Sequence, residues 1–272
     1  MLINNWHTHT YRCGHARGTD EEYVVAAIEA GIKKLGFSDH TPYPGVPKDG
    51  VRMDYSEADE YIASILNLKE KYKDKIEIYV GMEVEYYEDF LDVLEEFRRK
   101  LDYMILGQHG FNVEAEHSYG ITDREGLLRY CELVEKGCAS GLIDYIAHPD
   151  VCLWSYPRID ENVREVAQRI ATAAKKYDLP VEINCGSGVL RGKRRYEDEV
   201  RYPYPNREFF KIFAENDCDV VVGLDIHDPE LFKTDEYLDK ALSVVEGLGC
   251  RIIDDYDLIA AAQKRKREHS FI

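Results

Sequence analysis

The sequence predicts a closed barrel of parallel strands, each followed by a helix. Seven apolar, β-rich runs recur along the chain, and each ends in polar residues. Amphipathic segments lie between the runs at regular spacing over the whole length, which favours right-handed βαβ units closed into a barrel over an open sheet. The predicted strands are residues 2–9, 34–40, 76–85, 103–109, 143–148, 180–185 and 219–227.

Eight segments have helical periodicity and follow these strands. They are residues 21–30, 56–72, 89–101, 124–136, 162–177, 207–216, 236–248 and 258–268. Two stretches break the alternation: residues 41–54 contain three prolines, and residues 187–205 contain a cluster of arginines and a lysine. Both follow a strand, and loops in this position form the mouth where such barrels carry their active sites. We expect two long loops that contact a substrate.

Composition limits the partners of the chain. A length of 272 residues suits one barrel domain over residues 1–272, and seven scattered cysteines indicate free thiols in a reducing compartment. The net charge of −17 would repel a nucleic-acid backbone. No apolar run approaches the ~20 residues of a membrane span, and the first residues do not resemble a signal peptide. We therefore expect a cytoplasmic protein with neither a nucleic-acid nor a membrane partner.

Imidazoles and carboxylates concentrate where the predicted strands end. In an extended strand alternate side chains share a face, so His7 and His9 can chelate one ion, as can Asp225 and His227. The carboxyl ends of parallel barrel strands meet at one mouth, so residues far apart in sequence should converge there. The residues concerned are His7, His9, His15, Asp39, His40, Glu83, His109, His148, Asp225 and His227.

This convergence predicts a metal site. A single histidine at a strand end is commonly a hydrogen-bonded structural residue, but so many buried imidazoles would leave ring nitrogens without partners unless a metal bound them. Nitrogen and oxygen ligands suit zinc, iron or manganese, with zinc the leading candidate, and a thiolate from Cys13 is not needed. Ions held close together would bridge and activate a water and polarise a phosphoryl oxygen, which is the chemistry of multinuclear phosphatases.

Eight short motifs resemble those of the PHP (polymerase and histidinol phosphatase) superfamily, and within it the histidinol-phosphate phosphatases. The resemblance extends over nearly the whole chain. The motifs are HTH at 7–9, YRCGHARG at 11–18, GFSDH at 36–40, GMEVE at 81–85, GQH at 107–109, AHPD at 147–150, EIN at 182–184 and GLDIH at 223–227.

The resemblance implies a distorted (βα)₇ barrel with a trinuclear metal centre at its C-terminal mouth. It assigns His7, His9, Glu83 and Asp225 to one ion, and Glu83 with His109 and His148 to a second ion. It assigns His15, His40 and His227 to the third ion. The activity it implies is hydrolysis of L-histidinol phosphate, a step of histidine biosynthesis, with Asp225 and His227 acting in catalysis.

Arg191 matches the position at which phosphatase members of the family present an arginine to the substrate phosphate. It could equally belong to a solvated basic cluster with Arg194 and Arg195, and whether these two or Arg158 assist phosphate binding stays open. Residues 185–188 read CGSG, which departs from the family's Asn-Thr-Ser-Gly pattern at a place that bears on the identity of the substrate.

Two other functions stay open. One is a PHP phosphoesterase that acts on nucleotides, nucleic-acid ends or other small phosphate esters. The other is a non-catalytic metal-binding or regulatory barrel. Among the neighbouring polar residues, Glu85 could contact the substrate or the third ion, but a supporting position beside the ligands is favoured. Asp39 and Asp150 would either orient an imidazole or cap a helix. His117 and His269 are expected at the surface.

Overall fold

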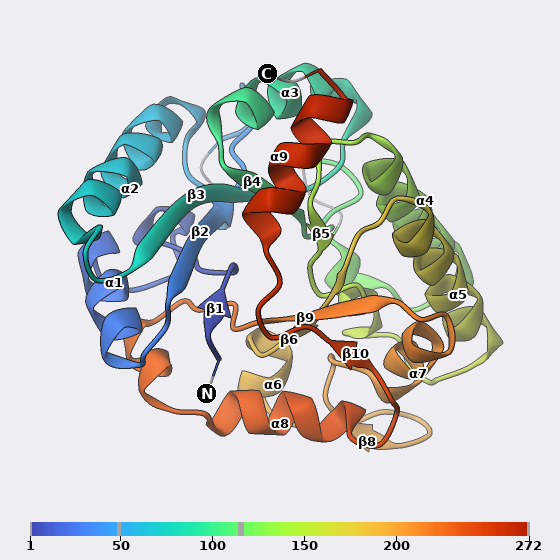
Figure 1. Ribbon diagram of the computed structural model, residues 1–272. Coiled ribbons are helices and arrows are strands. Elements are labelled where there is room, and N and C mark those ends of the chain that lie inside the picture. The colour runs from blue at the N-terminus through green and yellow to red at the C-terminus, as the bar shows by residue number, and fades with distance from the viewer. Residues whose placement is uncertain (1, 48–49, 114–116, 271–272) are drawn as a thin grey trace.

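The computed structural model describes residues 2–47, 50–113 and 117–270. Its centre is a sheet of eight strands, all paired in parallel, in the order β1-β2-β3-β4-β5-β6-β9-β10 (Figure 1). The strands are β1 Asn4–Asn5, β2 Lys34–His40, β3 Glu77–Val84, β4 Tyr103–Leu106, β5 Tyr145–Ile146, β6 Val181–Asn184, β9 Asp219–Gly223 and β10 Arg251–Ile252. The parallel βα architecture predicted from the alternating pattern is therefore confirmed.

The sheet curls so that its first strand meets the segment after β9. Thr8 forms a parallel bridge with Ile226, the backbone N–H of His9 donates to Ile226 O at 2.9 Å, and the N–H of Ile226 donates to His7 O at 3.2 Å. At the opposite end of β9, Arg251 and Ile252 of β10 pair with its first two residues. The segment after β1 and the strand β10 therefore pair at opposite ends of the chain segment that contains β9.

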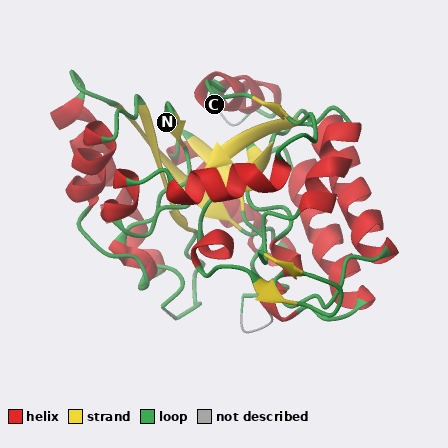
Figure 2. Cartoon of the chain, turned by 90° about the horizontal axis from the view of Figure 1, so that it is seen from below, coloured by secondary structure: helices red, strands yellow, loops and turns green. Residues whose placement is uncertain are grey.

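Helices surround the sheet, as Figures 1 and 2 show. They are α1 Asp20–Glu29, α2 Ala58–Tyr72, α3 Leu91–Lys100, α4 Arg124–Ala139, α5 Glu161–Lys176, α6 Ser187–Leu190, α7 Arg207–Glu215, α8 Glu236–Val245 and α9 Leu258–Glu268. Short 3-10 turns are η1 Tyr11–Cys13, η2 Tyr55–Glu57, η3 Glu88–Phe90, η4 Ser118–Gly120, η5 Val151–Leu153 and η6 Pro229–Lys233. None of the described helices combines the length and apolar character that crossing a bilayer requires.

Two details of the prediction were wrong. The predicted seven strands omit β10, and residues 187–205 are not only a loop, because they contain α6 and an antiparallel pair formed by β7 Arg194–Arg195 and β8 Val200–Arg201. In Figure 2 this pair lies at the end of the molecule opposite the two termini. The expected long loop at residues 41–54 is present up to η2, with residues 48–49 outside the described part.

The N-terminal end of the barrel is closed by α9, which lies across it in Figure 1. Leu258 and Ala262 of α9 pack on buried side chains of the barrel interior, including Trp6 and Tyr103. Arg98 of α3 donates to both carboxylate oxygens of Asp144, just before β5, and to the backbone oxygen of Ala262. Because α9 closes the N-terminal end, the carboxyl ends of the strands form the open end of the barrel.

Candidate metal centre

Strand register sets the first two side chains of the site side by side. His40 ends β2 and pairs directly with Glu83 of β3, and His40 Nδ1 lies 3.0 Å from Glu83 Oε2. His109 follows β4 and His148 follows β5, so each new strand adds a histidine at the same end of the sheet. The expected convergence of strand ends therefore occurs in the fold.

His7 and His9 form the first pair, opposite Asp225. Both imidazoles are completely buried, and their rings point to the same side because the chain is extended between them. Asp225 Oδ1 lies 3.6 Å from His7 Nε2 and 3.2 Å from His9 Nε2. The three ligand atoms lie within 4.8 Å of one another, which is close enough to share one ion.

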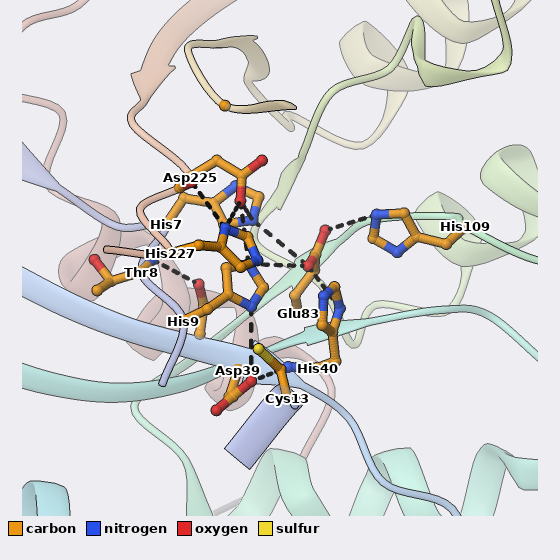
Figure 3. Close-up of polar contacts among 12 residues, drawn as sticks. His7, Thr8, His9, Cys13, Asp39, His40, Glu83, His109, Asp225 and His227 are labelled. Carbon is orange, nitrogen blue, oxygen red and sulfur yellow. Dashed lines mark hydrogen bonds and ion pairs between the residues drawn. The ribbon is translucent and has the colours of Figure 1, made fainter. Parts of the chain in front are cut away.

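The carboxylate of Glu83 lies between the histidines in Figure 3. Its Oε2 is 3.5 Å from His7 Nε2 and 3.4 Å from His9 Nε2. Its Oε1 is 2.7 Å from His148 Nε2 and 3.5 Å from His109 Nε2. Each oxygen thus faces a different group of imidazoles, as a carboxylate bridging two ions requires.

A third group lies on the more open side of the centre. His15, His40 and His227 offer ligand atoms within 4.8 Å of one another, and His15 is exposed, whereas His40 is buried. The rings of His9 and His227 stack with centroids 4.0 Å apart, which joins this group to the first. Eight of the nine residues proposed as ligands belong to such groups, and His109 joins them through Glu83 Oε1, 3.5 Å from its Nε2. The group of His15, His40 and His227 matches the expected third set, and that of His7, His9 and Asp225 matches the first set without Glu83, which instead groups with His7 and His148 and with His9 and His40.

Burial and nearby charge shift the protonation of these residues. Burial lowers the pKa of His9, but the carboxylates of Asp225 and Asp39 outweigh it and raise the pKa to about 9. The pKa of His227 falls to about 3 because of burial and the charge of His9. Burial opposes ionisation of Glu83, yet His109 and other histidines hold its pKa well below the usual range. In the metal-free site the carboxylates are therefore ionised, whereas His9 readily binds a proton and His227 stays neutral.

The buried polar atoms of the site test whether a metal fits. Within the described part of the chain, these imidazole and carboxylate atoms are buried and make no hydrogen bond: His7 Nε2, His9 Nδ1 and Nε2, Glu83 Oε2, His109 Nδ1, His148 Nδ1 and His227 Nε2. Buried groups of this kind are costly without a partner. Divalent ions would supply partners for the nitrogens and oxygens that face one another, so the residues present fit a metal centre.

Other polar residues support the proposed ligands. Asp39 Oδ1 lies 3.6 Å from His9 Nδ1, in agreement with its expected role beside an imidazole. Glu85 is buried beside His109 and pairs with Arg52, at 3.2 and 3.3 Å. Sequence reasoning missed Arg52 because it belongs to the long loop, whose path no local pattern specifies.

Asp150 and Cys13 lie near the proposed ligands but have different partners. Asp150 accepts from the backbone N–H of Asn206, the N-cap of α7, so it contributes to a helix start. Cys13 is buried, and its Sγ groups with ligand atoms of His9 and His227. Burial raises the pKa of the Cys13 thiol to about 12, so it stays neutral in the metal-free protein. His117 and His269 are exposed, as expected.

Two aromatic side chains, Tyr119 and Trp154, form a wall next to His109, and two arginines lie against it. The Tyr119 ring stacks on His109 with centroids 5.9 Å apart, and Trp154 meets Tyr119 edge to face at 5.0 Å. The guanidinium carbons of Arg191 and Arg194 lie 5.3 and 4.2 Å from the centre of the Trp154 ring.

Arg158 and Arg195 do not share this position. Arg158 pairs with Glu197 at 3.2 Å and with Asp160 at 3.5 Å, and Arg195 is exposed on β7. Arg191 is exposed as well, but it lies close enough to Tyr119 for its charge to oppose the rise in the pKa of that hydroxyl caused by burial, Asp225 and Glu83.

Comparisons with known proteins agree with this geometry. A family model described as the PHP domain matches residues 5–186. A protein named probable histidinol-phosphatase from Deinococcus radiodurans is 32% identical over 236 residues, covering 82% of this chain and 85% of that protein. A protein of the same name from Schizosaccharomyces pombe is 31% identical over 273 residues, covering 86% of this chain and 84% of that protein.

A solved structure shares the fold. It is the histidinol phosphate phosphatase of Lactococcus lactis complexed with zinc, L-histidinol and phosphate, with a TM-score of 0.69 at 18% identity, covering 93% of this chain and 95% of that chain. The matched residues of the family model include the strand ends from His7 to His148. With these matches, the chain belongs to the PHP domain family.

Proposed function

We propose that this chain is a metal-dependent phosphomonoesterase that hydrolyses L-histidinol phosphate to L-histidinol and phosphate. The observation that carries the proposal is the convergence of nine imidazole and carboxylate residues at the open end of the barrel, with ring nitrogens left without hydrogen bonds. The 32% identity to a probable histidinol-phosphatase over most of both chains supports this choice of substrate.

The nine residues would hold three divalent ions. His7, His9, Glu83 and Asp225 form the first set, and Glu83 with His109 and His148 forms the second. The third set is His15, His40 and His227. Zinc is our first choice, with iron or manganese as alternatives, because all three accept imidazole and carboxylate ligands. When bound, such ions lower the pKa of a water and offset charge on phosphoryl oxygens.

The chain's own groups would position the ester. Arg191 can turn from the Trp154 ring toward the centre and donate two parallel N–H bonds to phosphate oxygens. Asp225 and His227 would act in catalysis, because they border both the first and the third group of ligands. Tyr119 and Trp154 form an apolar wall next to His109 that would exclude water from the organic part of the ester.

Elemental analysis combined with a phosphatase screen tests this function. The metal-replete protein is offered histidinol phosphate, nucleoside monophosphates and a short oligonucleotide, and phosphate release is measured for each. We expect bound divalent metal and the highest kcat/KM with histidinol phosphate. Preference for the oligonucleotide would instead identify a nuclease-like phosphoesterase, and metal binding without turnover of any ester would identify a non-catalytic barrel.

A further inference from the structure

Glu182 of β6 is fully buried and accepts hydrogen bonds from four donors. Its Oε1 accepts from His7 Nδ1 at 2.8 Å and from the Tyr145 hydroxyl at 3.2 Å. Its Oε2 accepts from the backbone N–H of His148 at 3.0 Å and from Asn184 Nδ2 at 2.9 Å. The two oxygens of a carboxylate offer four acceptor sites, and these four donors match that number.

The bond to His7 determines which ring nitrogen faces the centre. Because Glu182 has only acceptors to offer, His7 Nδ1 must carry the proton and donate it. In the neutral ring the proton-free lone pair is then on Nε2, which is the atom that faces Glu83 and Asp225 at 3.5 and 3.6 Å. Glu182 therefore holds His7 in the tautomer that can bind an ion.

The bond to His148 acts on the backbone. His148 has a φ of 27°, in the left-handed region that a residue with a side chain rarely adopts. Such a conformation persists only where the surroundings enforce it, and Glu182 Oε2 fixes the N–H of this residue. The His148 ring is thereby directed at Glu83, 2.7 Å away.

A glycine on the neighbouring strand makes room for Glu182. Gly223 of β9 pairs with Asn184, and a Cβ on Gly223 would lie 1.7 Å from Glu182 Oε1. Two proposed ligands have the same arrangement, because a Cβ on Gly107 would meet Glu83 at 1.8 Å and one on Gly186 would meet Asp225 at 2.2 Å. Glu182 is thus accommodated in the same way as two carboxylates of the centre.

We propose that Glu182 is a positioning residue that holds one histidine of the first ion group and one of the second, His7 through its ring and His148 through its backbone. This inference rests on the proposed metal centre. Glu182 itself binds no ion in this proposal; it acts through the two histidines, in the manner of the outer carboxylates that orient metal-bound imidazoles.

The Glu182→Gln variant tests the proposal, because an amide has one acceptor and one donor end. With its NH₂ toward His7, the amide would favour the tautomer whose Nε2 carries the proton and cannot bind metal. With its NH₂ toward His148, it would leave the backbone N–H without an acceptor. In either orientation one of the two histidines is disturbed, so we expect metal affinity to fall about 10- to 100-fold.

The measurement is a Co²⁺ titration of the metal-free full-length protein against a chromophoric chelator, with the visible absorption of bound Co²⁺ as a second signal. We expect weaker binding and an altered spectrum for Glu182→Gln. Asp144→Asn is the control for a lost buried carboxylate at the other end of the barrel, and it should lower the melting temperature without changing Co²⁺ affinity or spectrum. Unchanged affinity and spectrum in folded Glu182→Gln would overturn the inference.

Glu182→Asp keeps the experiment decisive if the glutamine variant does not fold. The shorter side chain keeps the charge but withdraws the carboxylate from His7, so weaker Co²⁺ binding is expected, and wild-type affinity would refute the proposal. Absence of the proposed metal centre gives a different result, because the wild-type protein itself would then bind no Co²⁺. Failure of the phosphatase activity alone would leave this Co²⁺ comparison unchanged.

Discussion

The carboxylate of Glu83 occupies the space that a side chain on Gly107 would need. The two residues belong to neighbouring chain segments, with Glu83 on β3 and Gly107 directly after β4, and a Cβ on Gly107 would lie 1.8 Å from Glu83 Oε1. The carboxylate that faces most of the histidines is therefore fixed from behind by backbone rather than by a flexible side chain.

Gly107→Ala should displace this carboxylate and disrupt the centre. Because Glu83 faces both the first and the second group of histidines, we expect metal affinity to fall by at least about 10-fold, with a parallel loss of phosphatase activity. Chelator competition and phosphate release measure the two effects. Gly120→Ala is a matched control, since a Cβ there has no atom within 4 Å, and it should behave as the wild type. Wild-type metal binding by Gly107→Ala would contradict the central position of Glu83.

Removal of metal should abolish turnover and lower thermal stability together. Without metal, the centre contains the ionised carboxylates of Glu83 and Asp225 and buried ring nitrogens that make no hydrogen bond. A ligand present at 1,000 times its Kd stabilises the folded protein by about 4 kcal/mol. Calorimetry with and without a chelator, followed by addition of zinc or manganese, measures the effect. Full activity in protein with no detectable metal would refute the proposed mechanism.

Arg191→Ala should impair the phosphatase more than Arg158→Ala. Arg191 lies on the aromatic wall beside Tyr119, whereas Arg158 is held by Glu197 and Asp160. Loss of a charge-assisted phosphate contact of about 1.5–3 kcal/mol corresponds to roughly a 10- to 100-fold fall in kcat/KM. Steady-state kinetics gives kcat/KM for both variants and for the wild type. Equal activity of the two would assign Arg191 to the solvated basic cluster.

Metal uptake should release protons between pH 6.5 and 9. The folded pKa of His9, about 9, lies above its ordinary value of 6.5, so this group stabilises the metal-free protein fully below pH 6.5 and loses that contribution as the pH rises through 9. An ion must displace the same proton, so metal affinity should increase over this interval. Titration calorimetry in buffers of different ionisation enthalpy counts the protons released. Affinity that is independent of pH here would show that His9 is already neutral.

Asp144→Asn should destabilise the fold without affecting the metal centre. Asp144 is fully buried, and its partner Arg98 is buried as well, so removal of one charge leaves the other uncompensated, at a cost of about 3–5 kcal/mol. Denaturant unfolding of the metal-free protein measures the change. A stability equal to the wild type would show that the pair contributes little.

The sequence predicted the fold well because most strands are long enough to have their own pattern. Residues 34–40 and 219–223 are apolar runs between amphipathic helices, and their ends had to meet at one mouth once the sheet was parallel. The strands β1 and β5 also have two residues each, but they lie within the longer β-rich runs 2–9 and 143–148, whereas Arg251–Ile252 of β10 lies in no such run. The β7–β8 pair was missed because its charged residues resemble a loop.

Within the site, the sequence located side chains but not the contacts between them. His7 and Glu83 could be placed at strand ends, yet the inward position of Glu182 depends on the register between β6 and β9 and on the space above Gly223. The contact of Arg52 with Glu85 depends on the path of a long loop. These contacts arise from tertiary packing, which local patterns do not encode.

The bridge between Thr8 and Ile226 also dictates when the centre can form during synthesis. A nascent chain displays His7 and His9 first, but Asp225 and His227 leave the ribosome only when most of the polypeptide has been made. Until then the proposed first and third ligand sets lack Asp225 and His227 and are incomplete. The proposed centre would therefore be completed only after translation of β9, and a chain released before residue 225 would contain most of the histidines but would lack a ligand of both the first and the third set.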